Sequence, residues 1–267
     1  MNYTVFVTGV LKHYEATFDE VMSFHYPGLA PARRGNRWFY IRSNGEPACT
    51  GYFDKAWGYY DELACVVKNG RSYHILEDGT PAYSSRFAWC GNYQEKLCTV
   101  RDDEGNYFHI DTHGNPVYTP KYRYAGDYKS GFAAVQNDDG YYFHINRTGI
   151  PIYSKLFLDL GVFHKGFAPA KDKKGWFHID YKGNEIYSER FASVEPFYNG
   201  FSRVSLQNGD ICLINIKGNI VKIIRKISKF IPGGGPIICN SKNFFLCTGN
   251  LCYCLHHMCS FSVKNIF

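Results

Sequence analysis

Apolar positions recur along the chain with a period of 34 or 35 residues. An aromatic residue opens each period, and a second aromatic residue follows six positions later. The opening positions are Phe18, Phe53, Phe87, Tyr122, Phe157 and Phe191. A period of this size is typical of repeat proteins, in which each supersecondary unit buries its apolar face on its neighbour. The pattern therefore predicts six tandem units.

An isoleucine and a glycine mark the second half of every unit. The isoleucine never varies, and the glycine lies four positions after it. The isoleucines are Ile41, Ile75, Ile110, Ile145, Ile179 and Ile214. Because an unvarying apolar position indicates close packing, we expect these side chains in the core of each unit. The glycine is expected in the turn that follows.

Short apolar runs within each unit have the character of β-strands. Residues 132–135 and 142–145 are rich in aromatic and branched side chains, and residues 137–140 between them have the composition of a hairpin turn. The second residue of the first run is small in every unit, as at Ala133. Neighbouring units are expected to approach most closely there. The sequence thus predicts an all-β fold of six tandem β-repeats.

Six equal β-units can close into a propeller-like ring or remain an open β-solenoid or superhelix. Closure removes the exposed edges at the two ends of the array. Residues 3–9 resemble half a unit and could complete the last sheet, so we favour the closed ring and keep the open form as the alternative. A plain cap on an open array is the other interpretation of this segment.

The chain divides into three parts on this pattern. Residues 1–13 form an N-terminal cap or latch strand, and residues 14–222 form the six-unit β-repeat domain. Residues 223–267 are a basic, Cys-rich C-terminal tail without the repeat pattern. That tail is either a degenerate terminus or the start of a further domain.

The unit resembles the WG-type (WG containing) β-repeat family, which occurs in tandem arrays, largely in bacterial proteins. The resemblance rests on an aromatic strand that ends in Ile-Asp before a glycine turn, at residues 107–114 and 176–183, and on Gly-Phe-Ala at residues 131–133. It covers about residues 14–222. The Trp-Gly-Tyr-Ile-Asp of the family becomes Phe-His-Ile-Asp or Phe-His-Ile-Asn here, so the chain looks like a divergent branch. The resemblance implies a scaffold or interaction function with no catalytic residues.

The net charge of +6 comes from the end of the chain. No acidic residue follows Asp210, whereas seven basic residues do. Residues 1–210 therefore carry 23 basic and 24 acidic side chains. A nearly neutral body lacks the positive surface that phosphate binding requires, so nucleic acid is not expected as a partner.

Residues 222–231 place basic and apolar side chains on opposite sides of a short helix. This pattern leaves peripheral membrane contact or partner docking open. A last strand that runs into a solvated turn is the interpretation that we prefer. No stretch approaches 18 apolar residues, so no membrane span is predicted. Because no leader segment is recognisable, the cytoplasm is the expected compartment.

Ten cysteines divide equally between the repeats and the tail. Those in the repeats replace apolar residues of other units and are expected to be small buried side chains. Those in the tail crowd around His256 and His257, but their spacing lacks the paired two-residue intervals of a zinc knuckle. No metal or other cofactor is predicted.

One polar position recurs at the same place in four successive units. It is occupied by His74, His109, His144 and His178. In a closed ring these imidazoles could gather around the axis and hold a metal or an anion. However, equivalent groups in adjacent sheets lie on the order of 10 Å apart, which is too far for shared ligation. We therefore expect each ring to form hydrogen bonds with a backbone group of the neighbouring unit.

No residue set predicts catalysis. The carboxylate pairs Asp102–Asp103 and Asp138–Asp139 fall in expected hairpin turns, where aspartate is common. We therefore predict a non-enzymatic β-repeat scaffold that binds a protein partner through inter-strand loops or a concave face. Two alternatives remain: a saccharide-binding module that uses the repeated Tyr and Trp, and an accessory repeat region of a larger enzyme whose catalytic domain is absent.

Overall fold

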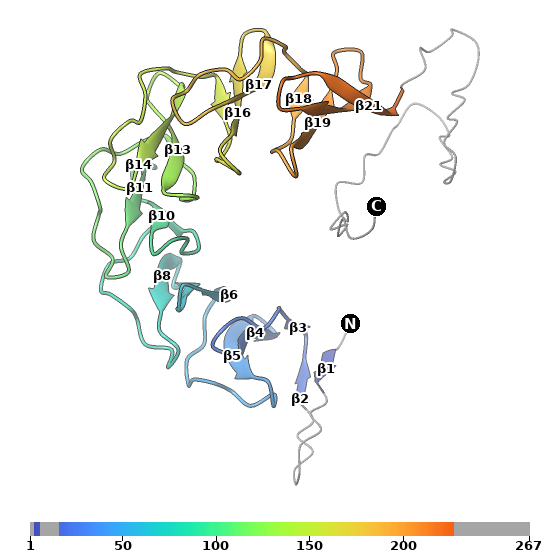
Figure 1. Ribbon diagram of the computed structural model, residues 1–267. Coiled ribbons are helices and arrows are strands. Elements are labelled where there is room, and N and C mark those ends of the chain that lie inside the picture. Colours follow the sequence, from blue (N-terminus) through green and yellow to red (C-terminus); the bar gives the residue numbers. More distant parts are fainter. Residues whose placement is uncertain (1–2, 6–15, 227–267) are drawn as a thin grey trace, which may run out of the picture.

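The computed structural model describes residues 3–5 and 16–226, and its regular elements there are all β-strands. Six small antiparallel sheets follow one another along an arc (Figure 1), and each sheet corresponds to one unit of the sequence. The all-β repeat architecture is therefore confirmed. Among the described residues no helix has the length and apolar character that a membrane span needs.

Each sheet contains three strands in sequence order, and the last sheet has a fourth. The first strands are β3 (Glu20–Val21), β6 (Lys55–Tyr60), β9 (Trp89–Cys90), β12 (Tyr124–Ala125), β15 (Asp159–Leu160) and β18 (Ser193–Val194). The second strands are β4 (Leu29–Arg34), β7 (Leu63–Lys68), β10 (Cys98–Arg101), β13 (Phe132–Gln136), β16 (Ala168–Asp172) and β19 (Phe201–Ser205). The third strands are β5 (Arg37–Arg42), β8 (Arg71–Ile75), β11 (Tyr107–Ile110), β14 (Tyr142–Asn146), β17 (Gly175–Ile179) and β20 (Ile211–Asn215).

The chain returns along the outer side of each third strand before it enters the next unit. Phe87, for example, exchanges two backbone hydrogen bonds with Ser72, at 2.9 and 3.0 Å. These bonds join the end of one sheet to the beginning of the next. In the first four units the return segment begins with a proline that bridges to the repeated isoleucine; these prolines are Pro47, Pro81, Pro116 and Pro151.

The last return segment is a continuous strand, β21 (Ile220–Arg225), which pairs with β20 through a register that shifts twice. Part of this strand falls in residues 222–231, the segment for which a last strand was preferred over an amphipathic helix. The strand is confirmed up to Arg225. Residues 227–231 and the cysteines and histidines of the tail lie outside the described residues.

The core lies between successive sheets. All six repeated isoleucines are fully buried, with 0% exposure, which confirms the packing role predicted for them. The small residue at the start of each second strand is also buried, as at Ala133. Because a small side chain occupies little space, the backbones of neighbouring sheets approach closely at this position.

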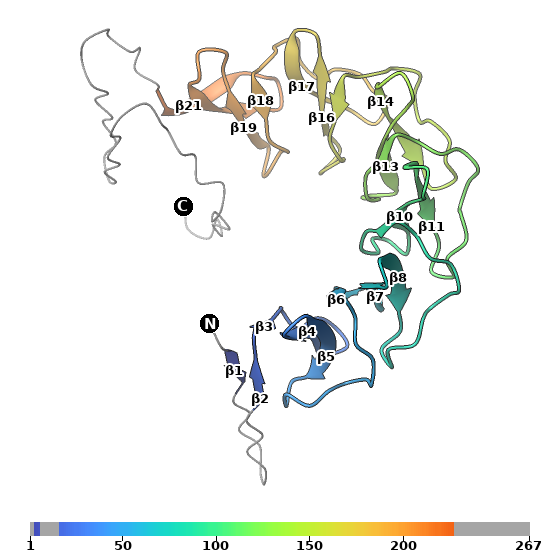
Figure 2. The same ribbon diagram turned by 180° about the vertical axis from the view of Figure 1, so that it is seen from behind.

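The closed ring does not form within the described residues. β1 (Tyr3–Val5) pairs with β2 (Ala16–Phe18), so its hydrogen-bonding edge is used near the first sheet and not at the last one. The first and last sheets lie at the two ends of an open arc, as the view from behind also shows (Figure 2). Of the two predicted arrangements, the described part of the chain adopts the open one.

The repeated glycine is required both by the backbone conformation of its turn and by a tyrosine side chain packed against it. Gly149 has a φ of +78°, and a Cβ added there would lie 2.6 Å from Cγ of Tyr118 in the preceding unit. Since real Cβ atoms do not approach other atoms so closely, a larger residue would displace the tyrosine ring or the turn. The glycine thus fixes how each unit packs on the previous one.

In the second to sixth units a tight turn with two positive φ angles joins the first and second strands. In the second and third units it contains no glycine: φ is 48° and 73° at Asp61 and Glu62, and 55° and 65° at Glu95 and Lys96. The acidic side chains reach the next unit. Asp61 accepts a hydrogen bond from the backbone N–H of Lys96 at 2.6 Å, and Glu95 accepts bonds from Ser130 and Gly131 at 2.5 and 2.9 Å. Charge-assisted bonds of this kind offset the backbone strain.

Candidate functional site

The four repeated histidines connect each unit to the next. Nε2 of His74, His109, His144 or His178 lies 2.8–2.9 Å from a backbone carbonyl oxygen 17 residues farther along the chain. The accepting carbonyls belong to Gly91, Gly126, Gly161 and Glu195. Each of these residues lies in the following unit. The expected hydrogen bonds to a neighbouring backbone group are therefore confirmed.

A tyrosine completes the hydrogen bonding of every histidine. Nδ1 contacts the hydroxyl of the tyrosine nine residues later; these tyrosines are Tyr83, Tyr118, Tyr153 and Tyr187. Because a carbonyl can accept but not donate, the proton must lie on Nε2, and Nδ1 accepts from the phenol. Both ring nitrogens are thus used, and the tautomer is fixed.

Burial keeps these imidazoles neutral. It lowers the pKa of His74, His109, His144 and His178 to about 4, against the weaker opposing effect of the carbonyl that accepts the Nε2 proton. All four rings have 0% exposure. Each also packs at a centroid distance of 4.2–4.6 Å on an aromatic ring of the next unit. A neutral, enclosed imidazole of this kind is suited to packing and not to proton exchange with solvent.

The first and last units have a different residue in place of the histidine. In the first unit the hydroxyl of Tyr40 donates directly to the carbonyl of Trp57 at 2.7 Å, and the small Cys49 stands where other units have the tyrosine. In the last unit Leu213 removes the polar group altogether. The described residues contain no group of three or more His, Cys, Asp or Glu side chains arranged to hold a metal ion.

The acidic pairs lie in turns, as predicted. Asp102 pairs with Lys121 at 2.7 Å, and Asp103 pairs with Arg71 of the preceding unit. Burial acts to raise the pKa of the Asp102 carboxyl, but the ammonium of Lys121 and the N–H of Asn106 together outweigh it and lower the pKa. The carboxylates of Asp102 and Asp103 thus have cationic partners that hold this turn to neighbouring segments.

A strip of four aromatic side chains, which sequence reasoning did not identify, runs across the third and fourth units. Trp89, Tyr107, Tyr124 and Tyr142 contact one another in that order, with ring centroids 6.1, 5.9 and 6.1 Å apart. Trp89 and Tyr124 are 40% and 44% exposed, and the other two are half-buried. We call these residues the aromatic strip.

Strand alternation places the two exposed members of the aromatic strip away from the core, whereas Tyr107 and Tyr142 pack partly against it. Cys90 and Ala125 are buried, so the residues before them, Trp89 and Tyr124, point to the other side of the sheet. Glycine leaves room for the rings: a Cβ at Gly91 would lie 3.2 Å from the indole of Trp89. This alternation was the signal in the sequence that could have identified the strip.

Charged groups surround the aromatic strip. The guanidinium of Arg101 lies 5.8 Å from the ring centroid of Tyr107. Burial raises the pKa of Tyr124, and the carboxylates of Asp127 and Asp159 raise it further. Burial also raises the pKa of Asp127, whose carboxylate accepts a hydrogen bond from the Thr99 hydroxyl at 3.2 Å. The strip therefore combines flat apolar surfaces with both a cation and carboxylates.

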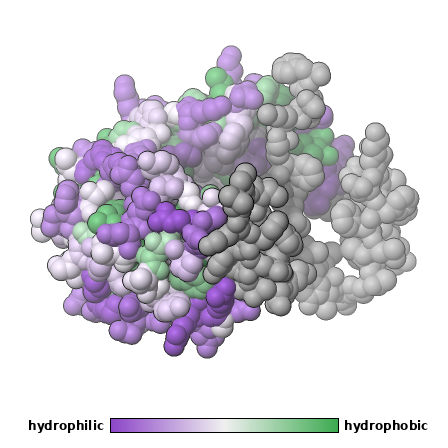
Figure 3. All heavy atoms as spheres, turned by 90° about the horizontal axis from the view of Figure 1, so that it is seen from below, coloured by the Kyte–Doolittle hydropathy of each residue, from purple (hydrophilic) through white to green (hydrophobic). Residues whose placement is uncertain are grey.

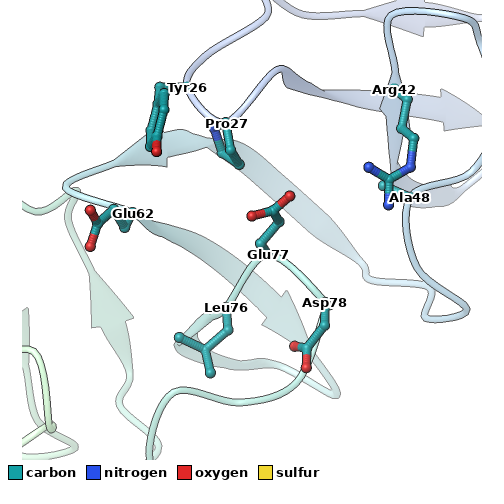
Figure 4. A pocket seen from close by; sticks show the side chains of 8 residues that line it. All are labelled: Tyr26, Pro27, Arg42, Ala48, Glu62, Leu76, Glu77 and Asp78. Atoms are coloured by element: carbon teal, nitrogen blue, oxygen red, sulfur yellow. The ribbon is translucent and has the colours of Figure 1, made fainter.

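A pocket of about 600 Å³ lies between the first and second units (Figure 4). Its lining contains the carboxylates of Glu62, Glu77 and Asp78, with Arg42 on the far side. Bonds from the hydroxyl and N–H of Thr80 lower the pKa of Asp78, so this group is ionised at neutral pH. The remaining lining is Tyr26, Pro27, Ala48 and Leu76. Such a lining is typical of a solvated groove between repeats.

The face seen from below is mostly hydrophilic, and hydrophobic residues appear there in small separate patches (Figure 3). Exposed apolar side chains are normal when they are scattered in this way. Continuous ring contacts distinguish the aromatic strip from such isolated residues.

Three segments of the chain match the family model of the WG containing repeat, at residues 38–71, 109–141 and 176–209. The chain carries WG repeats. The matches begin in the third strands of the first, third and fifth units, and the intervening units share the same buried isoleucine, glycine and aromatic positions. The predicted divergence from the family appears in the replacement of the Gly-Tyr of the motif by Phe-His. No curated protein matches the chain in sequence.

The chain is similar to several solved structures. A eukaryotic initiation factor has a TM-score of 0.51 at 10% identity, over 78% of this chain and 65% of that one. BamB from Moraxella catarrhalis has a TM-score of 0.46 at 12% identity, over 73% and 70% of the two chains. The C-terminal WD40 domain of Sif2 has a TM-score of 0.43 at 9% identity, over 75% and 67%. At these identities the likeness concerns the fold alone.

Proposed function

We propose that the protein is a non-enzymatic scaffold that binds a protein partner through the aromatic strip. The observation that supports this function is the continuous, partly exposed surface of Trp89, Tyr107, Tyr124 and Tyr142 beside Arg101. Trp, Tyr and Arg are the residue types that contribute most binding energy at protein interfaces. Trp and Tyr do so because they bury a large rigid area at a low cost in side-chain entropy.

The neighbouring turns add specificity to this surface. The turn at residues 102–105 carries three carboxylates, whereas the equivalent turn at residues 173–174 of the fifth unit carries two lysines. Such variable polar loops on a constant scaffold are where binding specificity commonly resides. A partner that spans the third and fourth units would meet apolar rings flanked by acidic turns.

A saccharide is the second candidate ligand, and it is favoured by the carboxylates at the aromatic strip. Sugar rings stack on exposed Trp and Tyr faces, and their hydroxyls donate to carboxylates. Asp127 and Asp159 both act on Tyr124 electrostatically, so both acceptors lie near one of the two most exposed rings. This candidate uses the same residues as the protein partner, and one set of variants tests both.

The test compares the wild-type protein, the Trp89→Ala/Tyr124→Ala double variant and a Tyr198→Ala control. Tyr198 is 58% exposed but lies outside the aromatic strip, where it packs on His164. Affinity purification from cell extract with quantitative mass spectrometry should identify a protein that the wild type and the control retain and that the double variant loses about tenfold or more. Direct binding with the purified partner must reproduce this order.

A glycan array with the same three proteins examines the saccharide candidate. Binding of one glycan class by the wild type and the control, but not by the double variant, would favour the saccharide. If all three proteins behave alike in both experiments, the aromatic strip is not a binding surface and the proposed function is wrong.

A further inference from the structure

Within the described residues no strand pairs with the outer edge of the last strand, and apolar side chains lie on both of its faces. β21 is the outermost strand of its sheet, and Figure 1 shows it at the end of the arc. All six of its residues are exposed. The aliphatic side chains of Ile220, Val221, Ile223 and Ile224 are 47–50% exposed. A strand edge presents unpaired N–H and C=O groups on which another strand can form.

This edge lacks the proline that the first four units carry in their return segments. Pro47, Pro81, Pro116 and Pro151 occupy one position of the return segment and bridge to the repeated isoleucine. Proline cannot donate a backbone hydrogen bond, so it interrupts an edge that would otherwise recruit a further strand. In the last unit the same register position, opposite Ile214, is Ile220. In the last unit the return segment is a continuous strand of six residues, with two register shifts in its pairing with β20.

The charge of the edge is positive, and the sequence that follows it adds no acidic side chain. Lys217, Lys222, Arg225 and Lys226 lie in or beside β21, and no acidic residue follows Asp210. Residues 227–267 therefore contain no carboxylate side chain that could pair with these cations. Two copies of the chain that met edge to edge would bring both sets of cations together. Like charges opposed in this way destabilise strand pairing.

We infer that β21 is a docking edge for an extended segment of a protein partner in which apolar and acidic side chains alternate. The backbone of the segment would pair with the free edge of β21 as a fifth strand. Its apolar side chains would cover the exposed isoleucines, and its carboxylates would pair with Lys222 and Arg225. This mode of recognition is strand addition, in which main-chain bonds supply affinity and side chains supply specificity.

The inference goes beyond the aromatic strip and does not depend on it. The strip lies in the third and fourth units, whereas β21 belongs to the last one. Positive charge serves here in two ways, since it discourages pairing between identical edges and selects an acidic strand. Variants of the strip and variants of the edge therefore report on separate surfaces.

The experiment uses the full chain and three fluorescein-labelled ten-residue peptides. The first alternates valine and glutamate, the second alternates valine and lysine, and the third repeats the first with N-methylated amides through its centre. Fluorescence anisotropy measures binding to the wild type, to Lys222→Glu/Arg225→Glu, to Ile220→Pro and to a Lys173→Glu/Lys174→Glu control. The control makes the same charge change on exposed lysines of the β16–β17 turn.

The wild type and the control should bind the glutamate peptide about tenfold or more tightly than either other peptide. Lys222→Glu/Arg225→Glu should reverse the preference toward the lysine peptide, because it inverts the sign of the edge. Ile220→Pro introduces the residue that the first four units have at this position and should weaken binding of the glutamate peptide. Amide hydrogen exchange should show protection of residues 221–225 by that peptide in the wild type.

Three results would overturn the inference. Equal binding of the N-methylated peptide would show attraction between charges without strand addition. Binding that appears only after removal of residues 227–267 would assign the edge to the chain itself. Dimers of the full chain that dissociate on Lys222→Glu/Arg225→Glu, detected by light scattering, would assign the edge to a second copy.

Discussion

Nε2 of His144 and the carbonyl oxygen of Gly161 lie 2.9 Å apart across the boundary between the fourth and fifth units. The same bond recurs at three other boundaries with the same sequence separation. A proton held between a buried ring and a buried carbonyl ties neighbouring sheets in one register, since a shift would leave both groups unsatisfied. The histidines are thus part of what makes the array rigid.

Stability should fall steeply as the pH decreases from about 6.5 to about 4. The pKa of each buried histidine is lowered to about 4 in the folded protein, whereas it is about 6.5 in the unfolded chain. Between these values the unfolded state binds more protons, so the contribution of a neutral histidine is fully present above 6.5 and is lost on acidification. At pH 5 the loss is about 2 kcal/mol for each histidine.

Urea denaturation at pH 7.5 and pH 5 measures this effect. Four such losses are comparable with the whole stability of an ordinary domain, about 5–15 kcal/mol. We therefore expect most molecules to be unfolded near pH 4.5. His178→Leu introduces the residue that the last unit has at this position. It should reduce the number of protons taken up on unfolding by about one. Equal midpoints at the two pH values would contradict the neutral, buried state of these rings.

Chelation should leave the repeat array unchanged. Both ring nitrogens of each histidine already form hydrogen bonds, with a carbonyl oxygen and with a tyrosine hydroxyl. A metal would have to displace one of these partners, and a second ligand would have to come from the adjacent unit. The melting temperature with and without a strong chelator should therefore agree within error. Stoichiometric zinc, copper or nickel that disappears in His144→Ala would show that the geometry serves ligation instead.

Much of the fold could be predicted from the sequence because each structural position of the unit occurs six times along the chain. The isoleucine, the small residue of the second strand and the histidine each recur at one register, so their burial and bonding could be predicted. Closure of the ring could not be predicted, because it depends on the small rotation between successive sheets. This rotation accumulates over the whole array. The pairing of β1 with β2 is likewise a contact that no repeat position encodes.

The candidate surfaces were missed for a different reason. Trp89 and Tyr124 are ordinary strand residues, and they become a strip only because the third and fourth units lie side by side. Ile220 is an ordinary β-former, and it becomes informative only when its register is matched to the prolines of earlier units. Both features depend on the alignment of neighbouring units in space.

Replacement of Ile145 by alanine should cost about 2–5 kcal/mol of folding free energy. The side chain is fully buried between two sheets, so its removal leaves a cavity that the close-packed neighbours cannot fill. Ile150→Ala is the matched control, because Ile150 is 59% exposed. That variant should change the stability by less than about 0.5 kcal/mol. Chemical denaturation that ranks the two variants in the opposite order would refute the core assignment.

Replacement of Lys96 by glycine should stabilise the protein by about 0.5–1 kcal/mol. Lys96 has a φ of 65°, a conformation that disfavours residues with a Cβ, and the later units place Gly131, Gly166 and Gly200 at its position. Its backbone bond to Asp61 does not need the side chain. The side chain does form an ion pair with Glu62 at 3.6 Å, but both groups are exposed and the pair contributes little.

The reciprocal variant, Gly131→Ala, isolates the backbone effect. A Cβ at Gly131 would meet nothing within 4 Å, so the change introduces no clash, and any cost arises from its φ of 80°. We expect it to destabilise the protein by about 1–2 kcal/mol, less a small entropic gain in the unfolded chain. Urea midpoints of the two variants should therefore move in opposite directions from the wild type. Movement in the same direction would mean that the turn geometry of these two units is not equivalent.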